Sequence, residues 1–88
     1  RIYDPQGMEG AKRRLRDIEE KCIYCQNEYE AVTGADGLII VTEWNQFRNL
    51  DLDRIKRVMK DTFFFDFRNI YKRGYIESKG FVYNAVGQ

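Results

Sequence analysis

The stretch from Leu38 to Val41 places four large apolar residues in succession, and this run constrains the fold more than any other feature of the chain. A strand that is apolar at successive positions is normally covered on both faces, as in a parallel sheet. Thr42, Glu43 and Trp44, the only tryptophan, follow directly. We therefore expect a buried strand at 38–42 that ends at the rim of a sheet, where ligands and other domains dock.

Other short apolar runs alternate along the chain with stretches of helical periodicity. We expect strands at 1–3, 22–26, 38–42, 62–66 and 81–86, helices at 6–20, 27–33 and after Asp51, a helical turn at 44–48, and an irregular or briefly helical segment at 69–80 broken by Gly74 and Gly80. Asn27 and Asp51 are the expected helix caps, and Gly34 ends the helix at 27–33. This alternation predicts an α/β domain with a mainly parallel sheet of about five strands flanked by helices.

The first expected helix, at 6–20, is amphipathic. Its apolar residues Met8, Ala11, Leu15 and Ile18 recur at steps of three and four, so we expect this side to face the core. The opposite side carries charges of both signs, which is more typical of a solvated face than of a basic docking patch.

Length and charge restrict the class of protein. The 88 residues have room for one domain, and 15 basic against 14 acidic residues give a net charge of +1. This balance disfavours a nucleic-acid-binding domain that would use KRRLR and YKRGY, because affinity for phosphate backbones comes mainly from excess positive charge. The longest apolar run is far shorter than the roughly 20 residues that span a bilayer. We expect a soluble, cytoplasmic protein with no membrane segment.

Cys22 and Cys25 form one C-x-x-C pair in a chain without histidine, so a four-ligand zinc site cannot be completed here. The expected strand at 22–26 places the two side chains on opposite faces, and neither cysteine starts a helix that would lower its pKa. We expect two ordinary core thiols and no metal.

Polar residues follow the expected strand ends at Tyr3 and Asp4, at 42–44, at 66–69 and in the tail 85–88. The carboxyl ends of parallel strands gather binding residues. Arg68 offers a five-donor guanidinium suited to phosphate, carboxylate or a pyrimidine carbonyl, and Asp66 could orient it or cap the turn. Residue types alone leave a structural salt bridge and a ligand contact at Arg68 equally open.

A complete catalytic set is not visible in the sequence. Without histidine, base catalysis would fall to Asp, Glu, Lys or Tyr, and no two of them are paired at a spacing that specifies a mechanism. The phosphate-binding patterns G-x-G-x-x-G and G-x-x-x-x-G-K-[ST] are both absent. From the residues alone, we expect a small α/β domain with a binding site at the edge of its sheet.

Four segments, in order, resemble the C-terminal, UDP-binding domain of the UDP-glucose/GDP-mannose dehydrogenase family. They are YDP at 3–5, GADGLIIVTEWNQFRNLDLDRIKRVMK at 34–60, FFFDFRNIY at 63–71 and GFVYNAVGQ at 80–88. T-E-W-x-x-F-R followed by D-x-R-N-I-Y is specific at this spacing, although each block alone is weak. The resemblance implies that residues 1–88 are a C-terminal nucleotide-sugar-binding domain with a Rossmann-like, three-layer fold.

For the whole enzyme, the resemblance implies oxidation of the C6 alcohol of a UDP-sugar to a carboxylate. Two NAD-dependent hydride transfers proceed through a thioester on a cysteine that Cys22 and Cys25 do not match. We therefore expect NAD to be bound mainly outside this chain. The expected partners are a UDP-sugar, the remainder of the dehydrogenase and further copies in a homo-oligomer. The alternative is a free-standing binding or regulatory module of the same fold that has lost the reaction.

The resemblance assigns a substrate contact to Arg68, which matches the arginine of the family's D-G-R-N stretch. Phe67 stands where the family usually has glycine, and a side chain there could change the turn or crowd the nucleotide. Trp44 and Phe47 also match family positions, and we expect this aromatic pair to pack in the core rather than contact the ligand.

In the family, a strand, a nucleotide-contacting loop and a helix precede the strand that ends in YDP. In a Rossmann-like order this additional strand lies near the middle of the sheet. We therefore interpret the chain as N-terminally truncated. We expect it either to bind nucleotide weakly or to close the gap by pairing strand 1–3 with strand 38–42.

Overall fold

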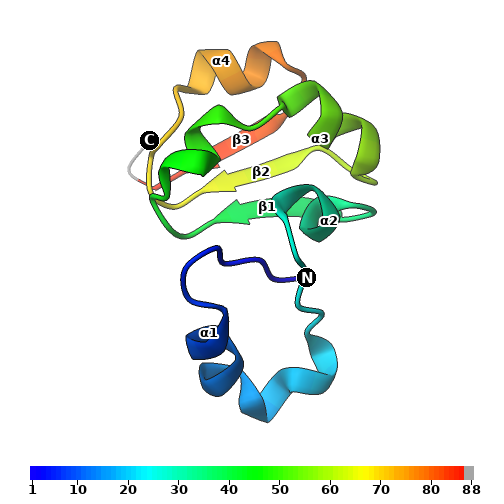
Figure 1. Cartoon of the computed structure of the whole chain (residues 1–88). Coiled ribbons are helices and arrows are strands. Elements are labelled where there is room, and N and C mark those ends of the chain that lie inside the picture. Colours follow the sequence, from blue (N-terminus) through cyan, green and yellow to red (C-terminus); the bar gives the residue numbers. More distant parts are fainter. Residues whose placement is uncertain (87–88) are drawn as a thin grey trace.

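The structure, a computed structural model, describes residues 1–86 and contains a parallel sheet of three short strands (Figure 1). The strands are β1 (Gly37–Ile40), β2 (Phe63–Asp66) and β3 (Val82–Ala85), and they lie in the order β1-β2-β3. Ile40 pairs with Asp66, and Asp66 pairs with Ala85, so the three strands end at the same level. The predicted parallel α/β architecture is confirmed.

Helices precede and connect these strands. They are α1 (Met8–Arg14), η1 (Arg16–Lys21), α2 (Glu28–Val32), η2 (Asn45–Asn49), α3 (Leu52–Val58) and α4 (Arg73–Ser78), with η denoting 3₁₀ helices. Both predicted caps are confirmed, because the Asn27 side chain accepts from Glu30 N at 2.8 Å and the Asp51 side chain accepts from Arg54 N at 3.1 Å. Gly34 follows α2 with a φ of 72°, as predicted for a residue that ends a helix.

Two helical predictions are corrected. The helix expected at 6–20 ends at Arg14 and continues as the 3₁₀ helix η1, in which Ile18 has a non-helical φ of −124°. Neither helix buries a residue, so the expected core-facing side lies outside the core. A short helix depends on tertiary packing, and α1 lines a cavity rather than a packed surface. Gly74, expected as a break, lies inside α4.

The first two expected strands, at 1–3 and 22–26, reduce to one parallel bridge between Ile2 and Tyr24. Ile2 N donates to Ile23 O at 2.8 Å, and Cys25 N donates to Ile2 O at 2.7 Å. Because the bridge of the Ile2 segment is to Tyr24 and a cavity lies between residues 1–4 and residues 37–42, the expected pairing of strand 1–3 with strand 38–42 is wrong. Within residues 1–86, β1 forms a ladder with β2 alone.

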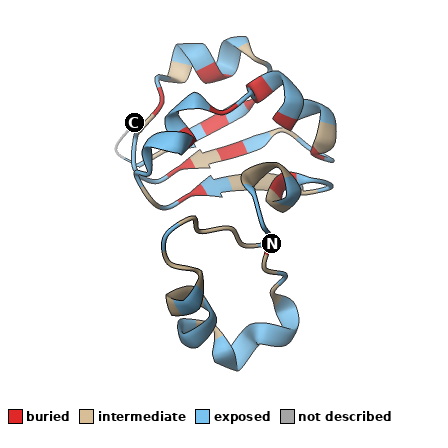
Figure 2. Ribbon diagram, in the orientation of Figure 1, coloured by how far each residue is buried: buried red, intermediate tan, exposed pale blue. Residues whose placement is uncertain are grey.

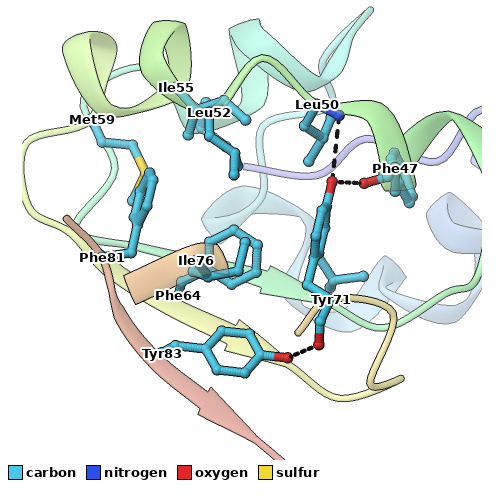
Figure 3. Packing of buried hydrophobic residues seen from close by; sticks show 12 residues of the cluster. Phe47, Leu50, Leu52, Ile55, Met59, Phe64, Tyr71, Ile76, Phe81 and Tyr83 are labelled. Atoms are coloured by element: carbon cyan, nitrogen blue, oxygen red, sulfur yellow. Dashed lines mark hydrogen bonds between the residues drawn. The ribbon is translucent and has the colours of Figure 1, made fainter. Parts of the chain in front are cut away.

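The hydrophobic core lies between one face of the sheet and the helices α2, η2, α3 and α4 (Figure 2). Phe64 is at its centre, with ring centroids 5.5 to 5.7 Å from those of Tyr71, Phe81 and Tyr83 (Figure 3). The buried cluster consists of Val32, Ile40, Phe47, Leu50, Leu52, Ile55, Met59, Phe64, Tyr71, Ile76, Phe81 and Tyr83. These side chains cover one face of the sheet.

The opposite face of the sheet is exposed, which corrects the expectation that 38–41 is covered on both sides. Ile39, Phe63 and Val82 alternate with buried residues on the three strands, and all three are exposed. Val41, just beyond β1, is exposed as well. No described helix buries these residues, so the three-layer arrangement has one open side within residues 1–86. None of the described helices is long and apolar enough to cross a membrane.

Candidate functional site

Arg68 and Glu43 meet at the carboxyl edge of the sheet. Because Ile40 pairs with Asp66, Glu43 and Arg68 lie a similar distance beyond neighbouring strand ends. Arg68 Nε donates to Glu43 Oε1 at 2.9 Å, and Arg68 Nη2 donates to the same oxygen. Both side chains are about half exposed. The hydrogen bond from Arg68, and then its charge, lowers the pKa of Glu43.

Asp66 fixes the turn that carries Arg68. Its side chain is 0% exposed. Oδ1 accepts from Arg68 N at 3.1 Å, and Oδ2 accepts from Tyr71 N at 2.9 Å and lies 2.8 Å from the Tyr83 hydroxyl. The sequence left open whether Asp66 orients Arg68 or caps the turn. Asp66 holds the backbone of the turn, whereas Glu43 holds the guanidinium.

Tyr71 and Tyr83 connect this turn to the core (Figure 3). The Tyr71 hydroxyl donates to Phe47 O and accepts from Leu50 N at 3.4 Å. The Tyr83 hydroxyl lies 2.9 Å from Tyr71 O and shares its hydrogen between this oxygen and Asp66. Burial raises the pKa of Tyr71 to about 12. Burial, followed by the hydrogen bond to Asp66, also raises the pKa of Tyr83.

Phe67 fits the turn without a glycine-type backbone. Among the described residues, Asn69 is the only non-glycine residue with a positive φ, of 53°. Asn69 Nδ2 also donates to Val86 O at 2.8 Å, which ties the turn to the end of β3. The Phe67 side chain is exposed. The left-handed position of the turn is thus Asn69, a residue type that tolerates it.

The first expected strand end consists of Tyr3 and Asp4. These two residues make contacts that stabilise the fold. Asp4 Oδ1 accepts from Gln6 N at 3.0 Å and from Gly7 N at 2.9 Å. Gln46 Nε2 donates to the Tyr3 hydroxyl at 3.2 Å. The Tyr3 ring lies edge-on to Phe47, with 6.3 Å between ring centroids. Tyr3 therefore joins the N-terminal segment to η2.

The two aromatic residues after β1 differ in burial. Phe47 is buried, as predicted. Trp44 is 36% exposed and precedes the first turn of η2, so the expectation that it packs in the core is wrong.

A cavity of about 810 Å³ separates the N-terminal segment from β1. Residues 1–4 line one side, residues 37–42 line the other, and Ala11 and Leu15 contribute from the α1 side. Val32, Phe47 and Ile55 reach it from the core. The cavity therefore lies beside the strand end that leads to Glu43.

The remaining residues that the sequence singled out do not lie beside Arg68, and two of them are not among the residues that the structure describes. Gly87 and Gln88 of the expected binding tail are outside the described residues. Cys25 is buried, as predicted, whereas Cys22 is half-buried. Within residues 1–86, no group of three or more metal-ligating side chains is present.

The contact of Glu43 with Arg68 was not predicted from the sequence. The register of β1 and β2, when extended beyond the strand ends, places Arg68 beside Thr42 and so next to Glu43, but residue types alone do not specify that register.

Comparison with known proteins found a matching family and related sequences. Residues 1–73 match the UDP-glucose/GDP-mannose dehydrogenase family, UDP binding domain. A UDP-glucose 6-dehydrogenase of Rhizobium meliloti (strain 1021) is 43% identical over 86 residues, which is 98% of this chain and 19% of that protein. A UDP-glucose 6-dehydrogenase of Pseudomonas aeruginosa is 33% identical over 90 residues, covering 100% of this chain and 20% of that protein. The chain thus spans about a fifth of these relatives.

The fold has a counterpart among solved structures. A UDP-D-ManNAc dehydrogenase from Pyrococcus horikoshii superposes with a TM-score of 0.64 at 22% identity, covering 88% of this chain and 20% of that one. This likeness supports the Rossmann-like architecture of the sheet. The family match over residues 1–73 shows that the chain belongs to the UDP-glucose/GDP-mannose dehydrogenase family.

Proposed function

We propose that the chain is the C-terminal domain of an NAD-dependent UDP-glucose 6-dehydrogenase, which converts UDP-glucose to UDP-glucuronate, and that Arg68 helps to bind the nucleotide part of the substrate. The observation that carries the proposal is the placement of Arg68 at the carboxyl edge of a parallel sheet, in a domain whose family is UDP-binding. Ligands bind at this edge in open α/β sheets.

The arrangement of Arg68 suits an anionic ligand. Its Nε and Nη2 donate to Glu43, and Nη1 has no hydrogen-bond partner within residues 1–86. The guanidinium is about half exposed, so these remaining donors are accessible to a diphosphate or a uracil carbonyl. Asp66 holds the backbone of Arg68 and Glu43 holds its guanidinium, which reduces the entropy lost when a ligand binds.

The residues described do not fit an NAD site. A dinucleotide-binding loop lies at the carboxyl ends of strands, where glycines let the backbone approach the pyrophosphate. Gly34 and Gly80, the two glycines with positive φ, precede β1 and β3 and so lie at the opposite edge. Cys22 and Cys25 flank the Ile2–Tyr24 bridge rather than Arg68. In this proposal NAD and the thioester cysteine belong to other parts of the enzyme.

The proposal also covers the setting of the whole enzyme. It acts in the cytoplasm as a homo-oligomer, and its product supplies polysaccharide biosynthesis. The support for these statements is the likeness to the family alone.

Calorimetric titration of UDP and UDP-glucose into the 88-residue chain tests the role of Arg68. Loss of a charge-assisted hydrogen bond costs about 1.5–3 kcal/mol, so Arg68→Ala is expected to weaken binding by about tenfold or more. Arg57→Ala is the matched control, because Arg57 lies in the last turn of α3, which leads to the amino end of β2. Equal affinities for the wild type and Arg68→Ala would refute the proposed contact.

A further inference from the structure

Arg68 shares its position at the edge of the sheet with a group of opposite charge. Glu43 Oε1 accepts from both Nε and Nη2 of Arg68, whereas Glu43 Oε2 accepts no hydrogen bond within residues 1–86. Both side chains are about half exposed, so the pair faces solvent rather than the core. An anionic ligand that approaches Arg68 therefore meets a positive and a negative charge together.

The turn that carries Arg68 is held by residues other than Glu43. The buried Asp66 side chain accepts from Arg68 N and from Tyr71 N. The segment that follows Glu43 is held separately, because the Tyr71 hydroxyl donates to Phe47 O (Figure 3). Glu43 therefore contributes mainly its charge and its contact with the guanidinium.

A second arginine acts on the same carboxylate. Arg48 belongs to η2, which begins two residues after Glu43. Its side chain is exposed and has no hydrogen-bond or ion-pair partner within residues 1–86. The hydrogen bond and charge of Arg68 lower the pKa of Glu43 most, and the charge of Arg48 lowers it further. Two guanidinium groups at this edge suit a diphosphate better than an uncharged uracil ring.

UDP and UDP-glucose differ in charge at the diphosphate. In UDP-glucose both phosphate groups are esterified on two sides, so each carries one negative charge. The terminal phosphate of UDP is free and has a second pKa of about 6, so at about pH 7.5 it carries nearly one further negative charge. A guanidinium alone favours the more highly charged UDP, and a carboxylate beside the guanidinium opposes this preference.

We propose that Glu43 sets the selectivity of this edge, by disfavouring the additional negative charge of free UDP relative to UDP-glucose. This inference rests on the proposed function, because it requires the diphosphate to lie beside Arg68. Glu43 leaves Nη1 of Arg68 available to the ligand while its own charge repels a second ionised oxygen. The ligand class that fits is a nucleoside diphosphate esterified at its terminal phosphate.

Calorimetric titration of the 88-residue chain measures this selectivity as the ratio of the dissociation constants of UDP and UDP-glucose, at low ionic strength and about pH 7.5. Glu43→Gln removes the charge and nearly keeps the shape, whereas Glu43→Asp keeps the charge. Asp61→Asn is the matched control, because it removes one negative charge at an exposed position just before β2, at the opposite edge of the sheet. Circular dichroism of each variant alone checks that it is folded.

We expect Glu43→Gln to shift the ratio about threefold or more in favour of UDP. Two charges about 7 Å apart near a protein surface change a binding constant by this amount, after attenuation by water and salt. Glu43→Asp and Asp61→Asn should keep the wild-type ratio. If Glu43→Gln leaves the ratio unchanged, even while it weakens both ligands equally, Glu43 only positions Arg68 and the proposal is overturned. An equal shift in Glu43→Asp would overturn it as well, because the charge would not be the cause.

Arg68→Ala separates failure of this inference from failure of the proposed function. If Arg68→Ala weakens both ligands while Glu43→Gln keeps the ratio, the substrate contact stands and the selectivity role of Glu43 is refuted. If Arg68→Ala binds both ligands as the wild type does, or if the wild type binds neither, both proposals are refuted.

Discussion

Replacing Asp66 by asparagine tests how the turn that carries Arg68 is held. The buried Asp66 side chain accepts from two backbone N–H groups, those of Arg68 and Tyr71, through different oxygens. Asparagine keeps one oxygen and supplies an NH₂, so one of these N–H groups must face another donor. The Tyr83 hydroxyl adapts at low cost, because its hydrogen can point to Tyr71 O instead.

The magnitude follows from these contacts. Leaving a buried donor without a partner costs about 1–3 kcal/mol, and a hydrogen bond to a charged group contributes about 1.5–3 kcal/mol. We therefore expect Asp66→Asn to lower the free energy of unfolding by about 3 kcal/mol, a large part of the roughly 5–15 kcal/mol typical of native domains.

Urea unfolding followed by circular dichroism measures this effect. With a slope near 1 kcal/mol/M for a small domain, the midpoint should fall by about 3 M. Asp53→Asn is the control, since the Asp53 side chain is exposed and its ion pair with Lys79 is 3.5 Å long. A midpoint for Asp66→Asn that is unchanged or higher would refute the reasoning, because it would mean that burying the carboxylate costs as much as its hydrogen bonds contribute.

Two further predictions concern ionisation. The pKa of Glu43 is lowered by Arg68, so this pair stabilises the fold above the unfolded pKa of 4.5 and ceases to do so as the pH falls through the lowered value. Carboxyl NMR titration should therefore show the pKa of Glu43 rising in Arg68→Ala, and an unchanged pKa would contradict the pairing. The pKa of Tyr71 is raised from 10.0 to about 12, so its contribution to stability is complete below pH 10 and is lost as the pH approaches 12. Tyr71→Phe should weaken this alkaline dependence and lower stability by about 1–2 kcal/mol, because Leu50 N and Phe47 O lose their partner. Absorbance at high pH and urea midpoints check both parts.

Local signals in the sequence predicted the C-terminal part of the fold well. The strand runs before Glu43 and Arg68 are apolar and closely bounded by turn residues, and the caps Asn27 and Asp51 bond to backbone N–H groups within three residues. Such features depend on neighbours in the chain, so patterns of residue type suffice to find them.

The N-terminal part was predicted less well, because the pattern of residue types does not show which contacts between distant segments form. Ile2 and Tyr24 form one bridge instead of two strands, and the apolar side of α1 lines a cavity. Periodicity shows which side of a helix or strand is apolar, but not whether a partner covers it.

Only part of the candidate site was predicted, because the other part depends on contacts between distant segments of the chain. Arg68 could be singled out by its position after a strand and by resemblance. Its contact with Glu43, 25 residues earlier in the chain, depends on the register between β1 and β2, which residue types alone do not specify.

The most direct test of the central claim is the NMR signal of the Arg68 Nε–H group during a titration of the chain with UDP to about 10 mM, which detects even millimolar affinity. If UDP contacts Arg68, this signal shifts and saturates as UDP replaces or joins Glu43 at the guanidinium, while the Arg57 Nε–H signal stays in place. An Arg68 signal that does not move, whether UDP perturbs other residues or none, would contradict it.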